Sequence, residues 1–184
     1  FYFDIRKDTL YCEDKSSKKR KDCQLLLNII LDSLLKWFAP ILSFTTEEIF
    51  KLVNKNDSEK SIHLKKLNVF PESWNNTKLK QNWQRIIDIR NEVNSSIETM
   101  RAEKIIGSSL EANIEIVLDS ENYNLVKNYD FSEICITSSA KITKAKEKEN
   151  PIKVNTVKAE GQKCAICWKI NKNGCERHSC SNKN

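Results

Sequence analysis

The chain has 184 residues, with 31 basic and 25 acidic side chains and a formal net charge of +6. Three glycines and three prolines are too few for a collagen-like, low-complexity or turn-dense all-β protein. No apolar stretch reaches the roughly 18 residues that a membrane helix needs, and no secretory signal follows Phe1. We therefore expect a cytoplasmic protein without a membrane partner.

Two helices are predicted in the first part of the chain. Apolar residues recur at three- and four-residue steps over residues 18–38, which predicts a helix with a wide buried face that ends at Pro40. Thr45 and Glu48 have the spacing of a capping box. This spacing predicts a second helix with Thr45 as its N-cap, continuing to about Val53.

A third long helix is predicted over residues 79–104. Its apolar stripe consists of Trp83, Ile86, Ile87, Val93, Ile97 and Met100. Arg90 lies close to this stripe, and Gly107 is a suitable terminator. Residues 1–107 are accordingly predicted to form an antiparallel helical bundle.

The periodicity changes after the third helix. Residues 113–118 alternate as a half-buried strand does, and Ser120 can cap a short helix over residues 121–128. Residues 141–149 have the composition of a charged connector. Further strands are predicted around Ile134, Ile136, Ile152, Val154 and Val157. Residues 108–158 are therefore expected to form a small α/β unit.

A cysteine cluster closes the chain in residues 159–184. Cys164 and Cys167 form a Cys-x-x-Cys knuckle, and Cys175 and His178 repeat its spacing. Zinc prefers four such N and S ligands in a tetrahedron, and a closed set leaves no position for a substrate. We predict one structural zinc ion on these four residues, with Cys180 as the rival to His178. The alternative is a frayed end with unligated thiols.

Positive charge is also concentrated at this end. Residues 141–184 hold 11 basic and 4 acidic side chains, whereas residues 1–140 hold 20 and 21. Such a run is often only a solvated surface, but it also suits a polyanion such as nucleic acid. Trp168 follows the knuckle among lysines, so it either packs on the zinc site or stacks on an unpaired base.

Motifs for catalysis are missing from the sequence. It contains no Gly-rich phosphate loop, no Gly-x-Ser-x-Gly and no His-Glu-x-x-His, and it has only two histidines. We therefore predict no catalytic residue in this chain.

Several blocks in order resemble the C-terminal part of bacterial isoleucyl-tRNA synthetase. One is Lys-Trp-Phe-Ala-Pro-Ile-Leu-Ser-Phe-Thr over residues 36–45, and another is Gly-Gln-Lys-Cys-x-x-Cys-Trp over residues 161–168. The others are residues 2–8, 90–94 and 101–112. This sequence departs from the family in Ile166, where an arginine is usual, and in His178, where a cysteine is usual.

The resemblance implies a helical anticodon-binding domain (1–107), a junction domain (108–158) and a zinc-binding domain (159–184). The parent would be a monomeric, ATP-dependent ligase that attaches isoleucine to its tRNA. ATP would bind only in a catalytic domain, whose His-x-Gly-His and Lys-Met-Ser-Lys-Ser motifs this chain lacks. The chain would grip the anticodon stem and loop of the tRNA for isoleucine. The RNA contacts implied are Trp168, Lys169, Arg177, Arg90 and Arg101.

Two other functional classes remain open at this point. Similar four-cysteine fingers close some DNA repair proteins, although those lack the helix-junction blocks. A zinc knuckle can also act purely as a protein-interaction module.

Overall fold

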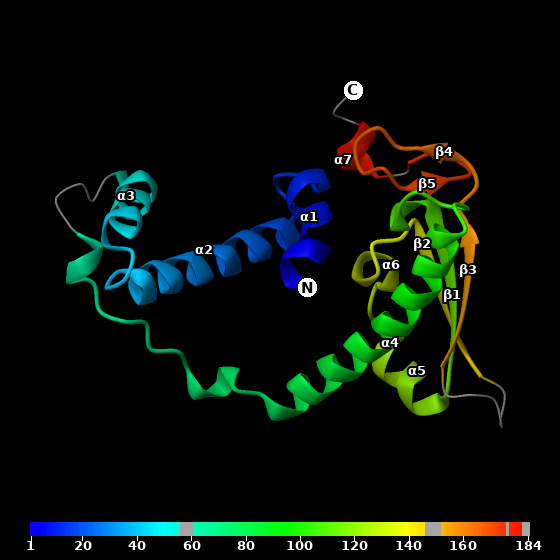
Figure 1. Cartoon of the computed structure of the whole chain (residues 1–184), viewed down its shortest axis with the longest axis horizontal. Helices are drawn as coiled ribbons and strands as arrows, with labels where there is room; N and C mark the ends of the chain where they lie inside the picture. The colour runs from blue at the N-terminus through cyan, green and yellow to red at the C-terminus, as the bar shows by residue number, and fades with distance from the viewer. Residues whose placement is uncertain (56–60, 146–151, 176, 182–184) are drawn as a thin grey trace. The chain divides into compact units, whose positions relative to one another are not determined.

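A computed structural model describes residues 1–55, 61–145, 152–175 and 177–181 (Figure 1). Contacts divide the chain into two compact units. One unit combines residues 1–14 with residues 76–184, and the other consists of residues 15–75. None of the helices in the described residues is long and apolar enough to cross a membrane.

Two helices form the unit of residues 15–75. Helix α2 (Lys18–Phe38) has the bounds that its periodicity predicts, and it packs against α3 (Ser43–Val53). Two short 3-10 turns follow, at Ile62–Leu64 and Glu72–Trp74. The small core of this unit consists of Leu35, Ala39, Phe50 and Ile62.

The predicted capping box at the start of α3 is wrong. The carbonyl of Leu42 already accepts hydrogen bonds from the backbone N–H and the hydroxyl of Thr46, both at 2.9 Å. Thr45 and Glu48 therefore lie inside the helix, and the N-cap is Leu42. The turn after α2 causes this early start, because the N–H of Leu42 bonds back to Phe38 at 2.7 Å and brings the chain directly into the next helix.

The larger unit, residues 1–14 and 76–184, is built around helix α4 (Thr77–Ala102). This helix begins and ends two residues before the predicted bounds. The side chain of Asn76 caps it by accepting from the N–H of Leu79 at 2.9 Å. Ile89 belongs to its buried stripe, whereas the predicted member Ile87 is only half-buried. Lys104, with φ +58°, turns the chain after the helix.

A three-stranded sheet packs against α4. Strand β1 (Ala112–Leu118) lies between β2 (Ser139–Lys144), which is parallel to it, and β3 (Ile152–Lys158), which is antiparallel. Alternate residues of β1 are buried and share one core with α4 and α5 (Ser120–Val126). The apolar residues of α4 and β1 in this core are Ile86, Ile89, Val93, Ile97, Ala112, Ile114, Ile116 and Leu118.

Three predictions in this region need correction. The cap of α5 is Asp119, whose carboxylate accepts from the N–H of Asn122 at 2.8 Å, and Ser120 is the first helical residue. The segment at Ile134 is no strand, because Asp130 caps the short helix α6 (Phe131–Ile134) instead. Residues 141–144 belong to β2, and residues 146–149 of the predicted connector lie outside the described residues.

The predicted mainly helical fold with a small α/β unit and a terminal knuckle is confirmed. The contacts do not follow the predicted boundary at residue 107, because α4 shares its core with the sheet. Helix α1 (Tyr2–Cys12) likewise belongs to the larger unit, with α4 and the sheet. This arrangement matters for the site, because α1, α6 and the knuckle then lie in one compact unit.

We predict that Ile89→Ala lowers the free energy of unfolding by about 2–5 kcal/mol, because Ile89 is fully buried between α4 and the sheet. Urea unfolding followed by circular dichroism measures the change. Glu92→Ala, on the exposed side of the same helix, is the matched control and should change the value by less than about 0.5 kcal/mol. Equal losses for the two variants would contradict this packing.

Candidate metal centre and nucleic-acid interface

The knuckle is a two-stranded hairpin with Cys164 and Cys167 in its turn. Strands β4 (Gln162–Lys163) and β5 (Ile170–Asn171) pair antiparallel. The N–H of Trp168 donates to the carbonyl of Cys164, and the N–H of Cys164 to that of Lys169, both at 3.0 Å. Gly161 is required at the base, because its φ is +128° and a Cβ there would overlap the carbonyl of Asn171.

Four cysteine sulfurs converge at the end of this hairpin. The Sγ atoms of Cys164, Cys167, Cys175 and Cys180 all lie within 4.8 Å of one another, and those of Cys167 and Cys175 are 3.8 Å apart. Four sulfurs about 2.3 Å from a tetrahedral zinc ion would be about 3.8 Å apart. The cluster therefore fits a zinc ion in both donor type and spacing.

The pKa values of the cluster thiols show that ionising several of them together is unfavourable without a cation. Burial raises the pKa of Cys167 to about 11, and the neighbouring sulfurs of Cys164 and Cys175 add to this effect. Burial also raises the pKa of Cys180, and Cys175 reinforces it. Burial acts the same way on Cys164, but hydrogen bonds from the N–H groups of Cys167 and Ile166 outweigh it and bring that pKa down to about 6. A bound cation removes the cost of placing several thiolates together.

Three of the four predicted zinc ligands are brought together here, namely Cys164, Cys167 and Cys175. The fourth sulfur is that of Cys180, the rival candidate, in the short helix α7 (His178–Ser181). The N–H of Cys180 bonds to the carbonyl of Arg177 at 2.9 Å. The side chain of His178 lies outside the described part of the chain.

Arg177 joins the cluster to helix α1. Its guanidinium donates to both carboxylate oxygens of Asp8, at 2.9 and 2.8 Å, and lies 3.6 Å from the carboxylate of Glu13. Burial alone would raise the pKa of Asp8, but the hydrogen bonds and charge of Arg177 outweigh it and lower that pKa below its usual value. Both side chains are about three-quarters buried, which suits a positioning contact rather than a phosphate contact.

Cys12 is a second link between α1 and the knuckle. Its thiol donates to the carbonyl of Ile166 at 3.7 Å, and it packs against Cys167 and Cys180. The hairpin is also tied to the sheet, because the N–H of Ile170 donates to the hydroxyl of Ser138 at 2.6 Å. These contacts hold the knuckle against both α1 and the residue that precedes β2.

The side chain of Trp168 is exposed at the surface of the knuckle rather than packed into it. Its side chain is 59% exposed, and its backbone has the left-handed φ of +62°. The Nζ atom of Lys163 lies 6.0 Å from the centroid of its ring. An exposed aromatic ring beside cations is the arrangement that stacks on unpaired bases.

The other predicted RNA contacts are distributed over one unit. The amine of Lys169 donates to the hydroxyl of Ser132 at 3.1 Å. Arg90 donates from Nε to the carbonyl of Ile134 at 2.9 Å, and its guanidinium lies 5.1 Å from the ring of Phe1. Arg101 lies apart from these, at the end of α4, in an exposed ion pair with Glu98 at 2.8 Å.

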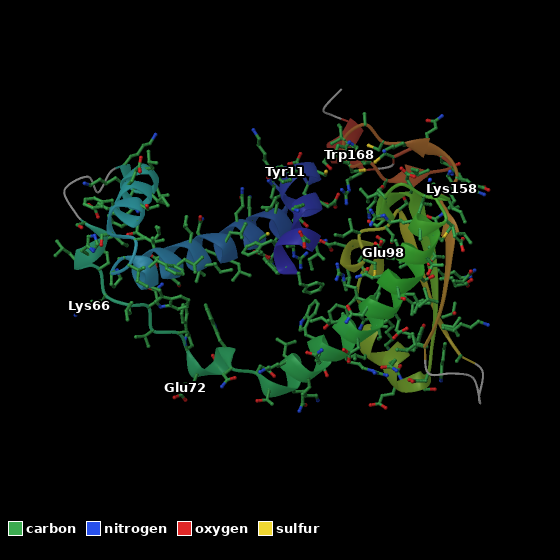
Figure 2. All side chains as sticks on the ribbon, viewed as in Figure 1. Tyr11, Lys66, Glu72, Glu98, Lys158 and Trp168 are labelled. Atoms are coloured by element: carbon green, nitrogen blue, oxygen red, sulfur yellow. The ribbon has the colours of Figure 1, made fainter. Side chains whose placement is uncertain are left out.

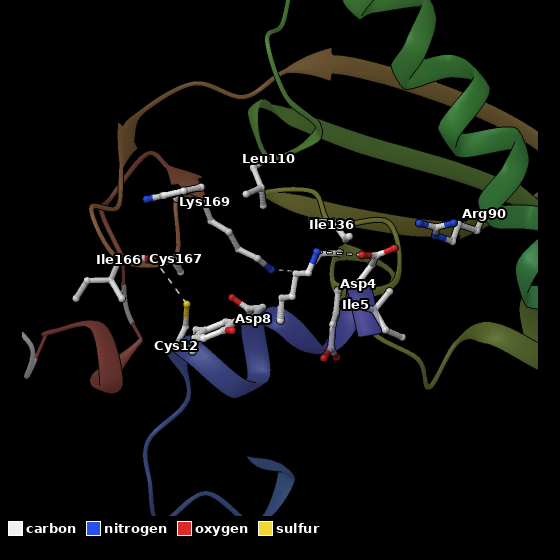
Figure 3. Close-up of a pocket in the computed structure, with 15 residues that line it drawn as sticks. Asp4, Ile5, Asp8, Cys12, Arg90, Leu110, Ile136, Ile166, Cys167 and Lys169 are labelled. Carbon is white, nitrogen blue, oxygen red and sulfur yellow. Dashed lines mark hydrogen bonds and ion pairs between the residues drawn. The ribbon is translucent and has the colours of Figure 1, made fainter. Parts of the chain in front are cut away.

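A cavity of about 550 Å³ opens between α1 and the knuckle (Figure 3). Lys169 and Cys167 lie on its knuckle side, Asp8 and Cys12 on α1, and Arg90 at its opposite end. Tyr11 and Trp168, both labelled in Figure 2, also belong to its lining. The structure thus brings Arg90, Trp168 and Lys169 to one cleft.

The sequence interpretation missed Asp8 and Cys12. They lie four residues apart on α1, and each contacts a residue more than 150 positions away. The only available signal was the cysteine count, since Cys12 is a further thiol outside the terminal cluster.

Comparisons with known proteins agree on one family. The anticodon-binding domain of tRNA ligase matches residues 1–116. Isoleucine–tRNA ligase of Pelagibacter ubique is 56% identical over 179 residues, which is 97% of this chain and 19% of that protein. Isoleucine–tRNA ligases of Bradyrhizobium diazoefficiens and Agrobacterium fabrum are 40% and 38% identical, each over 92% of this chain and 18% of the relative. The chain thus spans about a fifth of the length of these curated relatives.

We predict that Asp8 and Arg177 stabilise the fold cooperatively. In a double-mutant cycle of Asp8→Asn and Arg177→Met, the coupling should be about 1–3 kcal/mol, because the pair is bidentate and mostly buried. Urea unfolding of the four proteins gives the coupling. The exposed pair of Asp4 and Lys7 is the control and should show no measurable coupling. Additive effects of Asp8→Asn and Arg177→Met would contradict the link.

Proposed function

The chain belongs to the family of anticodon-binding domains of tRNA ligases, and from that membership we propose that it binds the anticodon stem and loop of the tRNA for isoleucine. The identity of the amino acid rests on the relatives, which are isoleucine–tRNA ligases at 56%, 40% and 38% identity. The match over residues 1–116 disfavours a DNA repair tail or a protein-interaction knuckle, which would share only the cysteines.

We place this role within a longer ATP-dependent ligase that attaches isoleucine to its tRNA. No catalytic residue is assigned to this chain, because its sequence contains none of the motifs that bind ATP in that reaction. The chain contributes the RNA grip, and the reaction takes place elsewhere in the parent. We propose that the parent acts in the cytoplasm as a monomer.

One observation carries the proposal, namely the exposed ring of Trp168 at the tip of a positively charged knuckle. The side chain is 59% exposed, the amine of Lys163 lies 6.0 Å from the ring centroid, and Lys169 lines the same cleft. By sequence, residues 141–184 carry a net charge of +7. A planar ring offers stacking to an unpaired base, while the lysines attract the flanking phosphates.

We propose that a structural zinc ion is held by Cys164, Cys167, Cys175 and Cys180. The convergence of these four sulfurs supports Cys180 as the fourth ligand in place of His178. When bound, the metal supplies a fixed tetrahedral tie and neutralises thiolate charge, without a position for substrate. The residues themselves then hold Trp168 and Lys169 at the surface.

The cationic residues take different roles in this proposal. Lys169 contacts phosphate, and Arg90 faces the same cleft from α4. Arg177 positions the knuckle on α1 through Asp8. Arg101 is an exposed phosphate contact at the end of α4. Among the described residues, its ion pair is with the carboxylate of Glu98, which a phosphate would have to displace.

We expect Cys180→Ser to lower the zinc bound per chain from one to near zero at micromolar free zinc, because three thiolates leave the tetrahedron incomplete. Metal analysis of the purified chain measures this. His178→Asn should keep one zinc ion per chain. If His178→Asn loses the metal and Cys180→Ser keeps it, the ligand set is the one that the sequence spacing favoured.

For RNA binding, we expect a hairpin with the isoleucine anticodon to bind more tightly than one that differs only in the anticodon. Trp168→Ala should weaken binding of the first hairpin by about 1–3 kcal/mol, since one stacked base is lost. Trp168→Phe retains a ring and should recover most of the affinity. Titration by fluorescence anisotropy, with zinc content checked, measures these values. Equal affinity for the two hairpins would refute anticodon reading by this chain.

A further inference from the structure

We infer that the cleft between α1 and the knuckle receives one unpaired nucleotide of the bound RNA, and this inference rests on the proposed function. The cleft has about 550 Å³, a volume typical of sites for small planar ligands. Its lining comes from α1, α4, α6 with the turn after it, the 3-10 turn Ser109–Glu111 and the knuckle, all of which belong to one compact unit. A surface stack on Trp168 alone would not use this space.

The charge of the cleft favours an anionic ligand. Three carboxylates line it, and each already has a cationic partner within 3.1 Å. The pairs are Asp4 with Lys7, Asp8 with Arg177, and Glu133 with Arg6. The negative charge of the lining is therefore satisfied within the protein.

Two cations of the lining have no such partner. Among the described residues, Lys169 and Arg90 form no salt bridge, and their polar contacts are a hydroxyl and a backbone carbonyl. Lys169 reaches into the cleft from the knuckle, whereas Arg90 comes from α4 on the other side (Figure 3). A nucleotide within a strand has a phosphate on each side of its base and sugar. Two separated cations therefore suit a nucleotide with two flanking phosphates better than they suit a ligand with a single phosphate.

Part of the cleft wall is apolar. Ile5, Leu110, Ile136 and Ile166 contribute side chains to it, and Trp168 lies at its knuckle end. Apolar side chains and an aromatic ring accept the faces of a planar base with little sequence preference. The cleft therefore offers an apolar wall for the base and two cations for the phosphates.

Backbone strain is concentrated at the same place. Three non-glycine residues with positive φ occur in the described chain, and two of them, Ile136 (φ +56°) and Trp168 (φ +62°), line this cleft. A β-branched residue in the left-handed region is a true outlier. Thr137 and Trp168 hold these turns through N–H bonds to Ser132 at 2.9 Å and Cys164 at 3.0 Å. Strain maintained by surrounding contacts is typical of ligand sites.

Methyl NMR of the full chain tests whether a base enters the cleft. With isoleucine methyl groups labelled, the hairpin with the isoleucine anticodon should shift the signals of Ile5, Ile136 and Ile166 through the ring current of the base. The half-buried Ile142, on β2, is the control and should not shift. Tight hairpin binding without shifts at the three residues would overturn the cleft proposal and leave the proposed function standing.

Filling the cleft gives a second test. Leu110→Trp should weaken hairpin binding at least tenfold, whereas Val157→Trp, at an exposed apolar position of β3, should stay within twofold. Zinc content and thermal unfolding confirm that both variants are folded. Unchanged affinity of a folded Leu110→Trp variant would overturn the proposal.

Lys169→Met keeps the test decisive where the tryptophan variant does not fold. It should weaken binding several-fold and reduce the salt dependence by about one phosphate contact, whereas the exposed Lys158→Met should do neither. Equal effects of the two variants would overturn the cleft as the phosphate site. If guanosine monophosphate binds as tightly as the hairpin, the ligand of the cleft is a free nucleotide, and the inference that it receives a nucleotide of bound RNA is overturned. If the unaltered chain does not bind the hairpin at all, both this inference and the proposed function are refuted.

Discussion

The convergence of four cysteine sulfurs is the constraint on which the proposed RNA-binding end of the chain depends. Beyond Lys158 the described strands are two residues long, and the buried apolar side chains are those of Ala159, Cys167 and Cys180. So little apolar burial cannot offset the entropy of ordering this segment. The proposed tetrahedral metal tie would supply what the missing core does not. In the proposed role, the metal centre would fix the positions of Trp168 and Lys169.

The same constraint extends to helix α1. Arg177 lies between two of the cluster cysteines in the chain and makes its bidentate bond to Asp8 from that position. Cys12 packs directly against the cluster. We therefore expect formation of the proposed metal centre to be coupled to the docking of α1, because residues of both line the cleft.

Local patterns predicted those parts of the fold that depend on local physics. The bounds of α2 followed from its 3.6-residue period, and β1 followed from strict alternation. The failures came where tertiary geometry outweighed a local signal. Thr45 has an ideal capping sequence, but the turn at Leu42 starts the helix earlier. Ile134 and Ile136 have high strand propensity. However, the cap at Asp130 places Ile134 in helix α6, and the left-handed φ of Ile136 places that residue in a turn.

The candidate site was predictable to the extent that its chemistry is local in sequence. Cys164, Cys167 and Cys175 were identified by spacing, whereas the choice between His178 and Cys180 depends on how α7 turns back. The contacts of Asp8 and Cys12 span most of the chain, and no short motif encodes them. The cleft is built from five segments of the chain, so it too could only emerge from the fold.

The central claim is that a metal-organised knuckle reads the anticodon. Its most direct test compares the affinities for hairpins with the isoleucine anticodon and with an altered one, before and after metal is removed from the full chain by a chelator. We expect discrimination between the hairpins to disappear with the metal, while the thermal transition of the α4 and sheet core is retained. Discrimination that persists after metal analysis shows complete removal would contradict it.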